Sequence, residues 1–196
     1  MKRYLIACAC AMAWGLFAYS QNKETGIYLT QLDFENGVLS YSPAAKNEKN
    51  KIRFNEIVEK PFINIRHNGE KIVLFKDDIY AYVKNGTIVR THDFVSYNFL
   101  DRGVVWIYYK DITTPLGKGI KRERKYYYAL SGSDKIIPLT VMNLKKSFAE
   151  NYALHNLLDV QFRKDSDLGS YNSLEKKFQV NHLLETTLFG TGNAMP

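Results

Sequence analysis

Residues 117–125 hold the densest concentration of charge in the chain. Five cations surround a single acid, Glu123, and three tyrosines follow directly at 126–128. Cations beside aromatic rings can hold a phosphate group, a sulfated sugar or a lipid headgroup. The residues predicted to bind such an anionic glycan or lipid headgroup are Lys121, Arg122, Arg124, Tyr126 and Tyr128. The alternative interpretation is an edge strand whose Lys and Arg side chains discourage aggregation.

Tyrosine spacing allows a second kind of binding. Alternation along a strand puts Tyr80 with Tyr82, and Tyr126 with Tyr128, on shared faces. A row of exposed rings can stack on sugars, whereas half-buried tyrosines pack in a sheet and keep their hydroxyls wet. Packing is the interpretation that we favour for both pairs.

No metal site or cofactor is predicted. The four histidines, His67, His92, His155 and His182, lack the i, i+3 or i, i+4 spacing that places two imidazoles on one helix face. His67 and His92 each fall at the end of an expected strand and could meet in space. Positions on the surface of a strand explain them better.

Motifs for catalysis are equally scarce. No serine lies in a GxSxG motif, no SxxK motif precedes a plausible partner, and the glycine-rich segment 117–119 lacks the spacing that cradles phosphate. Asp77 and Asp78 are adjacent, so in a strand they would point to opposite faces instead of across a glycosidase cleft. A turn between two hairpins is the better interpretation of this pair.

The first twenty residues predict export. Lys2 and Arg3 precede about 14 uninterrupted apolar residues, and Ala18 and Ser20 provide the small side chains of a signal peptidase site. We therefore expect residues 1–20 to be a signal peptide, cleaved after Ser20. A retained anchor would need roughly 20 apolar residues to span the hydrocarbon core.

A lipoprotein is a second alternative, because Cys8 follows a short sequence that resembles a lipid attachment site. Its position argues against this, since too few apolar residues precede it. Both cysteines, Cys8 and Cys10, are then removed with the signal peptide, and the mature chain has neither thiol nor disulfide. A cysteine-free exported domain fits a bacterial periplasm or an extracellular location, and we expect neither a nucleic-acid partner nor a transmembrane segment after cleavage.

Turn signals predict an antiparallel meander of about eight strands or more. Asn68-Gly69 and Asn85-Gly86 favour two-residue hairpin turns. The expected hairpins pair 61–67 with 70–76, 78–84 with 87–93, 94–100 with 104–110, and 122–130 with 135–139.

Helical spacing begins after Pro138. Thr140 is a predicted N-cap, 151–162 fits a second helix, and Ser173 is the expected cap of a third. The predicted fold is α+β and mainly β, an antiparallel meander sheet or partly open barrel packed by two or three C-terminal helices. The expected organisation is one domain over 21–188, with its helices from about 140 and a disordered tail over 189–196.

Two stretches carry a resemblance to a known group of sequences. The first comprises residues 25–30, Asp33-Phe34 and Asn36-Gly37, and the second comprises 138–140, 143–146, Phe148 and 157–159. Over most of the mature chain they resemble a group of uncharacterised bacterial exported proteins. The resemblance implies export and a shared fold, and it implies no catalytic residue.

The predicted function is that of a non-catalytic binding or structural protein of the bacterial cell envelope. The alternative is a periplasmic or secreted hydrolase whose catalytic carboxylates cannot be recognised in the sequence. A deep cleft with two converging carboxylates would favour the enzyme, and a shallow basic or aromatic face would favour binding.

The processing site gives the first prediction. The exported protein should begin at Gln21, carry no lipid and contain no free thiol, because both cysteines precede the cleavage site. N-terminal sequencing and intact mass of the exported protein measure this. An acylated Cys8, or a folded protein that retains Met1, would contradict it.

Overall fold

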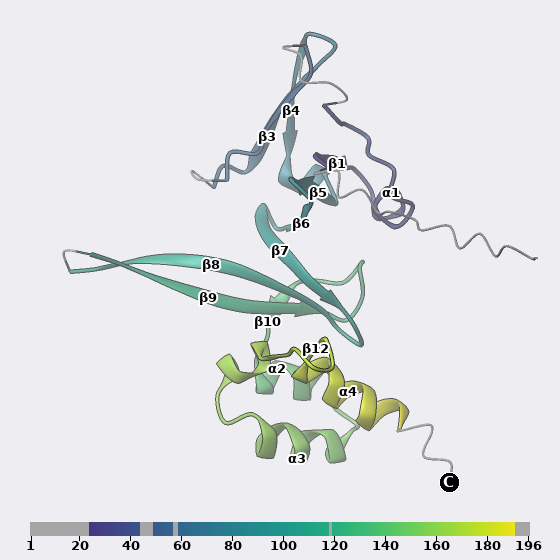
Figure 1. The fold of residues 1–196 in the computed structure, drawn as a ribbon, viewed down its shortest axis with the longest axis vertical. Coiled ribbons are helices and arrows are strands. Elements are labelled where there is room, and N and C mark those ends of the chain that lie inside the picture. Colours follow the sequence, from purple (N-terminus) through teal and green to yellow (C-terminus); the bar gives the residue numbers. More distant parts are fainter. Residues whose placement is uncertain (1–23, 44–48, 57–58, 118, 191–196) are drawn as a thin grey trace, which may run out of the picture.

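A computed structural model describes residues 24–43, 49–56, 59–117 and 119–190. The predicted cleavage site at Ser20 and residues 191–196 of the predicted disordered tail lie outside this part of the chain, whereas Phe189, the first residue of that tail, ends a helix. The fold is mainly β with antiparallel sheets, and it places several helices at the C-terminus, as the sequence predicts (Figure 1). The sheets are open and do not close into a barrel.

A seven-stranded sheet in the order β1-β5-β6-β7-β8-β9-β10 forms the centre. Its strands are β1 (Gly26–Tyr28), β5 (Ala81–Lys84), β6 (Thr87–His92), β7 (Val95–Arg102), β8 (Trp106–Leu116), β9 (Gly119–Ala129) and β10 (Ile137–Pro138). A three-stranded sheet of β2 (Lys51–Arg53), β3 (Phe62–His67) and β4 (Glu70–Phe75) lies at one end of the long axis, and the C-terminal helices lie at the other (Figure 1).

Both Asn-Gly hairpins are confirmed. Asn68 and Gly69 join β3 to β4 with φ of 52° and 91°, and Asn85 and Gly86 join β5 to β6 with φ of 51° and 82°. These are the positive values that a two-residue turn requires at both centres. The Asn68-Gly69 turn sets the register that aligns Arg66 with Lys71 across β3 and β4.

The longest hairpin differs from the prediction. The sequence predicts that 122–130 pairs with 135–139, but β9 pairs with β8 along its whole length and meets β10 at Tyr127 and Tyr128 alone among the described residues. The turn at Gly117, where φ is 57°, connects β8 with β9. No Asn-Gly pair marks this turn, so the pattern that revealed the other hairpins is missing here.

Four α-helices are described: α1 (Gln31–Glu35), α2 (Val141–Ser147), α3 (Tyr152–Gln161) and α4 (Gln179–Phe189). Thr140 caps α2 as predicted, since its hydroxyl accepts from the Asn143 N–H at 3.1 Å. The last three helices cover one face of β8 and β9, where their apolar side chains bury Val105, Ile107 and Tyr128. The helical residues of this core include Leu144, Leu154, Leu158, Val180, Leu183 and Leu184.

The predicted cap of the third helix is wrong. Ser173 lies in a tight hairpin between β11 (Tyr171–Asn172) and β12 (Lys177–Phe178), and α4 begins only at Gln179. The Asn172 side chain accepts from the backbone N–H groups of Leu174 and Glu175, which stabilises a turn in place of a helix. Leu174, the residue after the predicted cap, is 92% exposed.

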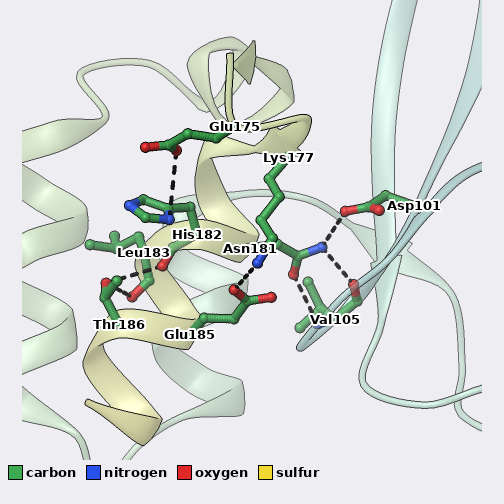
Figure 2. Close-up of polar contacts among 9 residues, drawn as sticks. All are labelled: Asp101, Val105, Glu175, Lys177, Asn181, His182, Leu183, Glu185 and Thr186. Carbon is green, nitrogen blue, oxygen red and sulfur yellow. Dashed lines mark hydrogen bonds and ion pairs between the residues drawn. The ribbon is translucent and has the colours of Figure 1, made fainter. Parts of the chain in front are cut away.

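A buried asparagine fastens the helical layer to the sheet. The Asn181 amide on α4 donates to the Asp101 carboxylate at 2.8 Å and to the Val105 carbonyl at 3.0 Å, and its oxygen accepts from the Val105 N–H at 3.0 Å (Figure 2). Asn181 is 1% exposed. A Cβ at Gly103 would come within 2.4 Å of the amide, so the β7–β8 turn can approach α4 only because this residue is glycine.

Asn181→Asp tests this contact. A carboxylate would keep the acceptor for the Val105 N–H, but it would face Asp101 and a carbonyl without a donor, so the free energy of unfolding should fall by about 3 kcal/mol. Asn172→Asp is the matched control, because Asn172 uses its side-chain oxygen as an acceptor and its change should stay within about 0.5 kcal/mol. Urea denaturation measures both, and equal midpoints would contradict the role given to Asn181.

Candidate functional site

The distal half of the β8–β9 hairpin forms an arm, defined here as residues 111–117 and 119–125. All described residues of the arm are exposed except Ile112, which is half-buried. The arm leaves the body between the three-stranded sheet and the helices and extends away from both (Figure 1). An isolated two-stranded ribbon has little stability of its own, so the arm depends on the buried base of the same hairpin.

Three predicted binding residues lie on this arm. Register places Arg124 opposite Asp111, Arg122 opposite Thr113 and Lys121 opposite Thr114. Among the described residues, no strand pairs with the outer side of β9 over 119–125, so this segment has the open edge that the solubility interpretation requires. Both interpretations of the segment are therefore compatible with its position.

Two acidic residues, Asp111 and Glu123, balance part of the positive charge of the arm. Arg124 binds Asp111 through two hydrogen bonds of 2.8 and 3.0 Å and stacks over the Tyr109 ring at 3.9 Å. The hydrogen bonds from Arg124 lower the pKa of Asp111. Glu123 binds Lys125 at 2.5 Å and Lys121 at 3.7 Å.

Arg122 forms no direct ion pair with the described residues, but after Arg124 its charge also helps to lower the pKa of Asp111. No carboxylate oxygen of the described residues lies within 4.0 Å of its guanidinium. At the tip, Leu116 is 68% exposed and Ile120 is 63% exposed. The arm thus presents apolar side chains at its end and cations behind them.

The other two predicted binding residues, Tyr126 and Tyr128, lie outside the arm and pack toward the C-terminal helices. Tyr128 is fully buried beneath the helices, and its hydroxyl shares a 2.7 Å hydrogen bond with Ser147. Tyr126 packs against Gly169 in the 3₁₀ turn η2 (Asp165–Gly169) and belongs to the same core. The C-terminal helices cover this face of β9, so Tyr128 is buried and Tyr126 is half-buried.

Tyr80 and Tyr82 are packed in the protein, as expected, but they lie on different sides of the sheet. Tyr80 precedes β5, contacts Phe34 and donates its hydroxyl to the Gly132 carbonyl at 2.9 Å. Tyr82 stacks on Phe54 with 4.5 Å between ring centroids. The expectation of a shared face is wrong, since strand alternation does not extend back to Tyr80. Burial raises the pKa of both hydroxyls.

A polar cleft of about 300 Å³ lies near the base of the arm. It contains the carboxylates Glu56, Glu59 and Asp111 and the buried amine Lys76, which is 2% exposed. Burial lowers the pKa of Lys76, and the nearby Glu59 opposes this effect. Glu56 binds Lys84 and accepts from the Tyr82 hydroxyl, Glu59 binds Lys110 at 3.1 Å, and Asp111 binds Arg124.

The histidines form no common site. His67 contacts the Tyr41 ring edge-on, His92 lies 3.5 Å from Asp93, and the His155 ring hydrogen-bonds to the carbonyls of Lys145 and Phe148 at the end of α2. His182 lies 3.7 Å from Glu175 at the surface of α4 (Figure 2). No group of three metal-binding side chains occurs within the described ranges. Asp77 and Asp78 lie in the short turn η1 (Lys76–Asp78), as predicted.

Sequence analysis missed four cations that share the outer face of the three-stranded sheet: Lys51, Arg53, Arg66 and Lys71. The spacing of these cations in the sequence could have predicted their shared face. Arg66 and Lys71 are symmetric about the Asn68-Gly69 turn, which makes them cross-strand neighbours, and Lys51 and Arg53 have the two-residue spacing of one strand face.

Comparison with protein-family models, with curated proteins and with solved structures finds no match to this chain. No described helix combines the length and the apolar character needed to cross a bilayer.

The structural role of Tyr128 can be measured with a double-mutant cycle. Tyr128→Phe and Ser147→Ala should each lower the free energy of unfolding by about 1 kcal/mol, because each removes the same hydrogen bond. The double variant should lower the free energy of unfolding by clearly less than the sum of the two single changes. Thermal or urea unfolding gives the coupling energy, and fully additive losses would show that the two hydroxyls do not interact.

Proposed function

We propose that this protein is an exported, non-catalytic binding module of the bacterial cell envelope that docks on an anionic lipid surface through its arm. The observation that carries the proposal is an exposed hairpin with an apolar tip and cations behind it. Leu116 and Ile120 would enter the headgroup region, and Lys121, Arg122 and Arg124 would lie near the anionic headgroups. Apolar burial combined with electrostatic attraction is the usual basis of binding at a bilayer surface.

The burial of the tyrosines favours lipid over glycan at this site. A glycan-binding arm would need exposed rings beside its cations, but Tyr126 and Tyr128 are packed under the helices. The exposed large side chains of the described residues at the end of the arm, Leu116 and Ile120, are aliphatic. Aliphatic tips suit the acyl-headgroup boundary, and they offer no flat ring on which a sugar can stack.

A hydrolase is the less supported alternative. Carboxylate catalysis at the polar cleft would need one carboxyl group free to donate a proton and another free to act as base or nucleophile. Glu56, Glu59 and Asp111 each have a cationic partner in the described structure. These pairs favour fixed carboxylates with a structural role.

Vesicle co-sedimentation tests the lipid proposal. The processed protein should bind vesicles that contain phosphatidylglycerol, bind neutral phosphatidylcholine vesicles far less, and lose binding as salt screens the exposed charges. Changing Lys121, Arg122 and Arg124 together to glutamine should reduce the affinity about 100-fold, at about 1 kcal/mol per cation. Leu116→Ser with Ile120→Ser should remove the binding that remains at high salt.

A charge-matched control uses the exposed cations Lys135, Arg163 and Lys176, which lie away from the arm. Their joint change to glutamine alters the net charge equally and should leave vesicle affinity nearly unchanged. Equal losses in the two triple variants would show that overall charge, and not the arm, attracts the protein. Binding that ignores salt, or that persists in the arm variant, would refute the proposal.

A further inference from the structure

The outer face of the three-stranded sheet is a cationic platform, defined as Lys51, Arg53, Arg66 and Lys71. Alternation along β3 sends Ile63 and Ile65 inward, where they are buried, and leaves Asn64 and Arg66 outward. The same alternation exposes Lys51 and Arg53 on β2 and Lys71 on β4. Four cations therefore share one face of a small sheet.

Three of these cations stand in one cross-strand row. Lys51 lies opposite Arg66, and Arg66 lies opposite Lys71. Directly opposite positions place neighbouring Cβ atoms about 5 Å apart. A hollow of about 850 Å³ is lined by all four platform cations, and no carboxylate of the described residues lines it.

The platform differs from the arm in how its charge is balanced. On the arm, Asp111 and Glu123 bind three of the cations. On the platform, Lys51, Arg53 and Lys71 have no carboxylate within 4.0 Å among the described residues. Like charges close together on one face of a sheet repel, so an anion that contacts Lys51, Arg53 or Lys71 would reduce this repulsion.

Apolar side chains continue the same face. Phe62 lies opposite Phe75, and Phe75 and Val73 are 50% and 54% exposed. The Lys60 amine lies 5.5 Å from the centroid of the Phe62 ring. Phe75 thus lies on the same face as Lys71, four residues along β4 with Val73 between them. A face with cations at one end and an exposed aromatic ring at the other fits an extended ligand that has both apolar ring faces and negative groups, and acidic sugar chains have both.

We propose that the cationic platform binds an acidic glycan, with its anionic groups on the row Lys51–Arg66–Lys71 and a sugar ring against Phe75. The site is separate from the arm in sequence and in position, since it lies at the end of the molecule opposite the helices (Figure 1). It requires neither the lipid ligand nor the arm residues.

Binding of dextran sulfate, with uncharged dextran as its matched control, tests the proposal by calorimetry. The protein should bind dextran sulfate and not dextran, and Lys51→Gln with Lys71→Gln should weaken binding about 30-fold. Phe75→Ala should weaken dextran sulfate binding but leave binding of polyphosphate, a polyanion without sugar rings, unchanged. Equal effects on the two polymers would overturn the assignment to a glycan.

The arm triple variant separates the two proposals. It should bind dextran sulfate like the parent protein, whatever its effect on vesicles. If the arm variant loses dextran sulfate and the platform variant keeps it, the platform proposal is wrong and the arm is the anion site.

Lys71→Glu distinguishes a binding role from a structural one. An acid in the middle of this cationic face should raise the thermal midpoint of the ligand-free protein by about 2–4 °C, because it replaces repulsion with attraction. The same variant should lose dextran sulfate binding. A lower midpoint together with lost binding would show that Lys71 supports the fold, and would overturn the proposal.

Discussion

The hydrogen-bonded pairing of β8 with β9 is the interaction on which the rest of the structure depends. It runs from Trp106 opposite Ala129 to Leu116 opposite Gly119. At its base the pair is buried beneath the C-terminal helices through Ile107 and Tyr128, and at its far end it is bare. The buried base offsets the marginal stability of the free ribbon, so one hairpin serves both the core and the surface.

Side-chain contacts must hold the layers together, because the expected mature chain has no cysteine. The apolar core between β8–β9 and the helices supplies most of this stability, but apolar burial does not fix one orientation of the helices. Asn181 does, since its hydrogen bonds to Asp101 and Val105 are satisfied at one position of α4 on the β7–β8 turn. A hydrogen-bonded polar group in a buried interface can therefore select one packing from several of similar apolar area.

Local turn chemistry made the hairpins predictable, and its absence explains the errors. Asn68-Gly69 and Asn85-Gly86 each require a conformation that few other dipeptides adopt, so sequence identified both turns. Gly117 adopts the same region without an Asn-Gly signature, and the longest hairpin was missed. Serine is a typical helix N-cap, but at Ser173 the side chain of the preceding Asn172 stabilises a turn instead. Whether a turn or a helix forms depends on such side-chain hydrogen bonds, which hydrophobic periodicity does not report.

The candidate sites were harder to predict from the sequence than the hairpins. Local composition identified the cations of the arm, but the packing of Tyr126 and Tyr128 toward the helices depends on tertiary contacts. The platform illustrates the reverse, because Lys51 is distant in sequence from Arg66 and only the pairing of β2 with β3 brings them together. A charge cluster built by strand register leaves no local run of basic residues. Charge that is local in sequence can have acids beside it, as Asp111 and Glu123 lie beside the arm cations, whereas charge assembled across strands is set by register, as where Lys51, Arg66 and Lys71 lie in one cross-strand row.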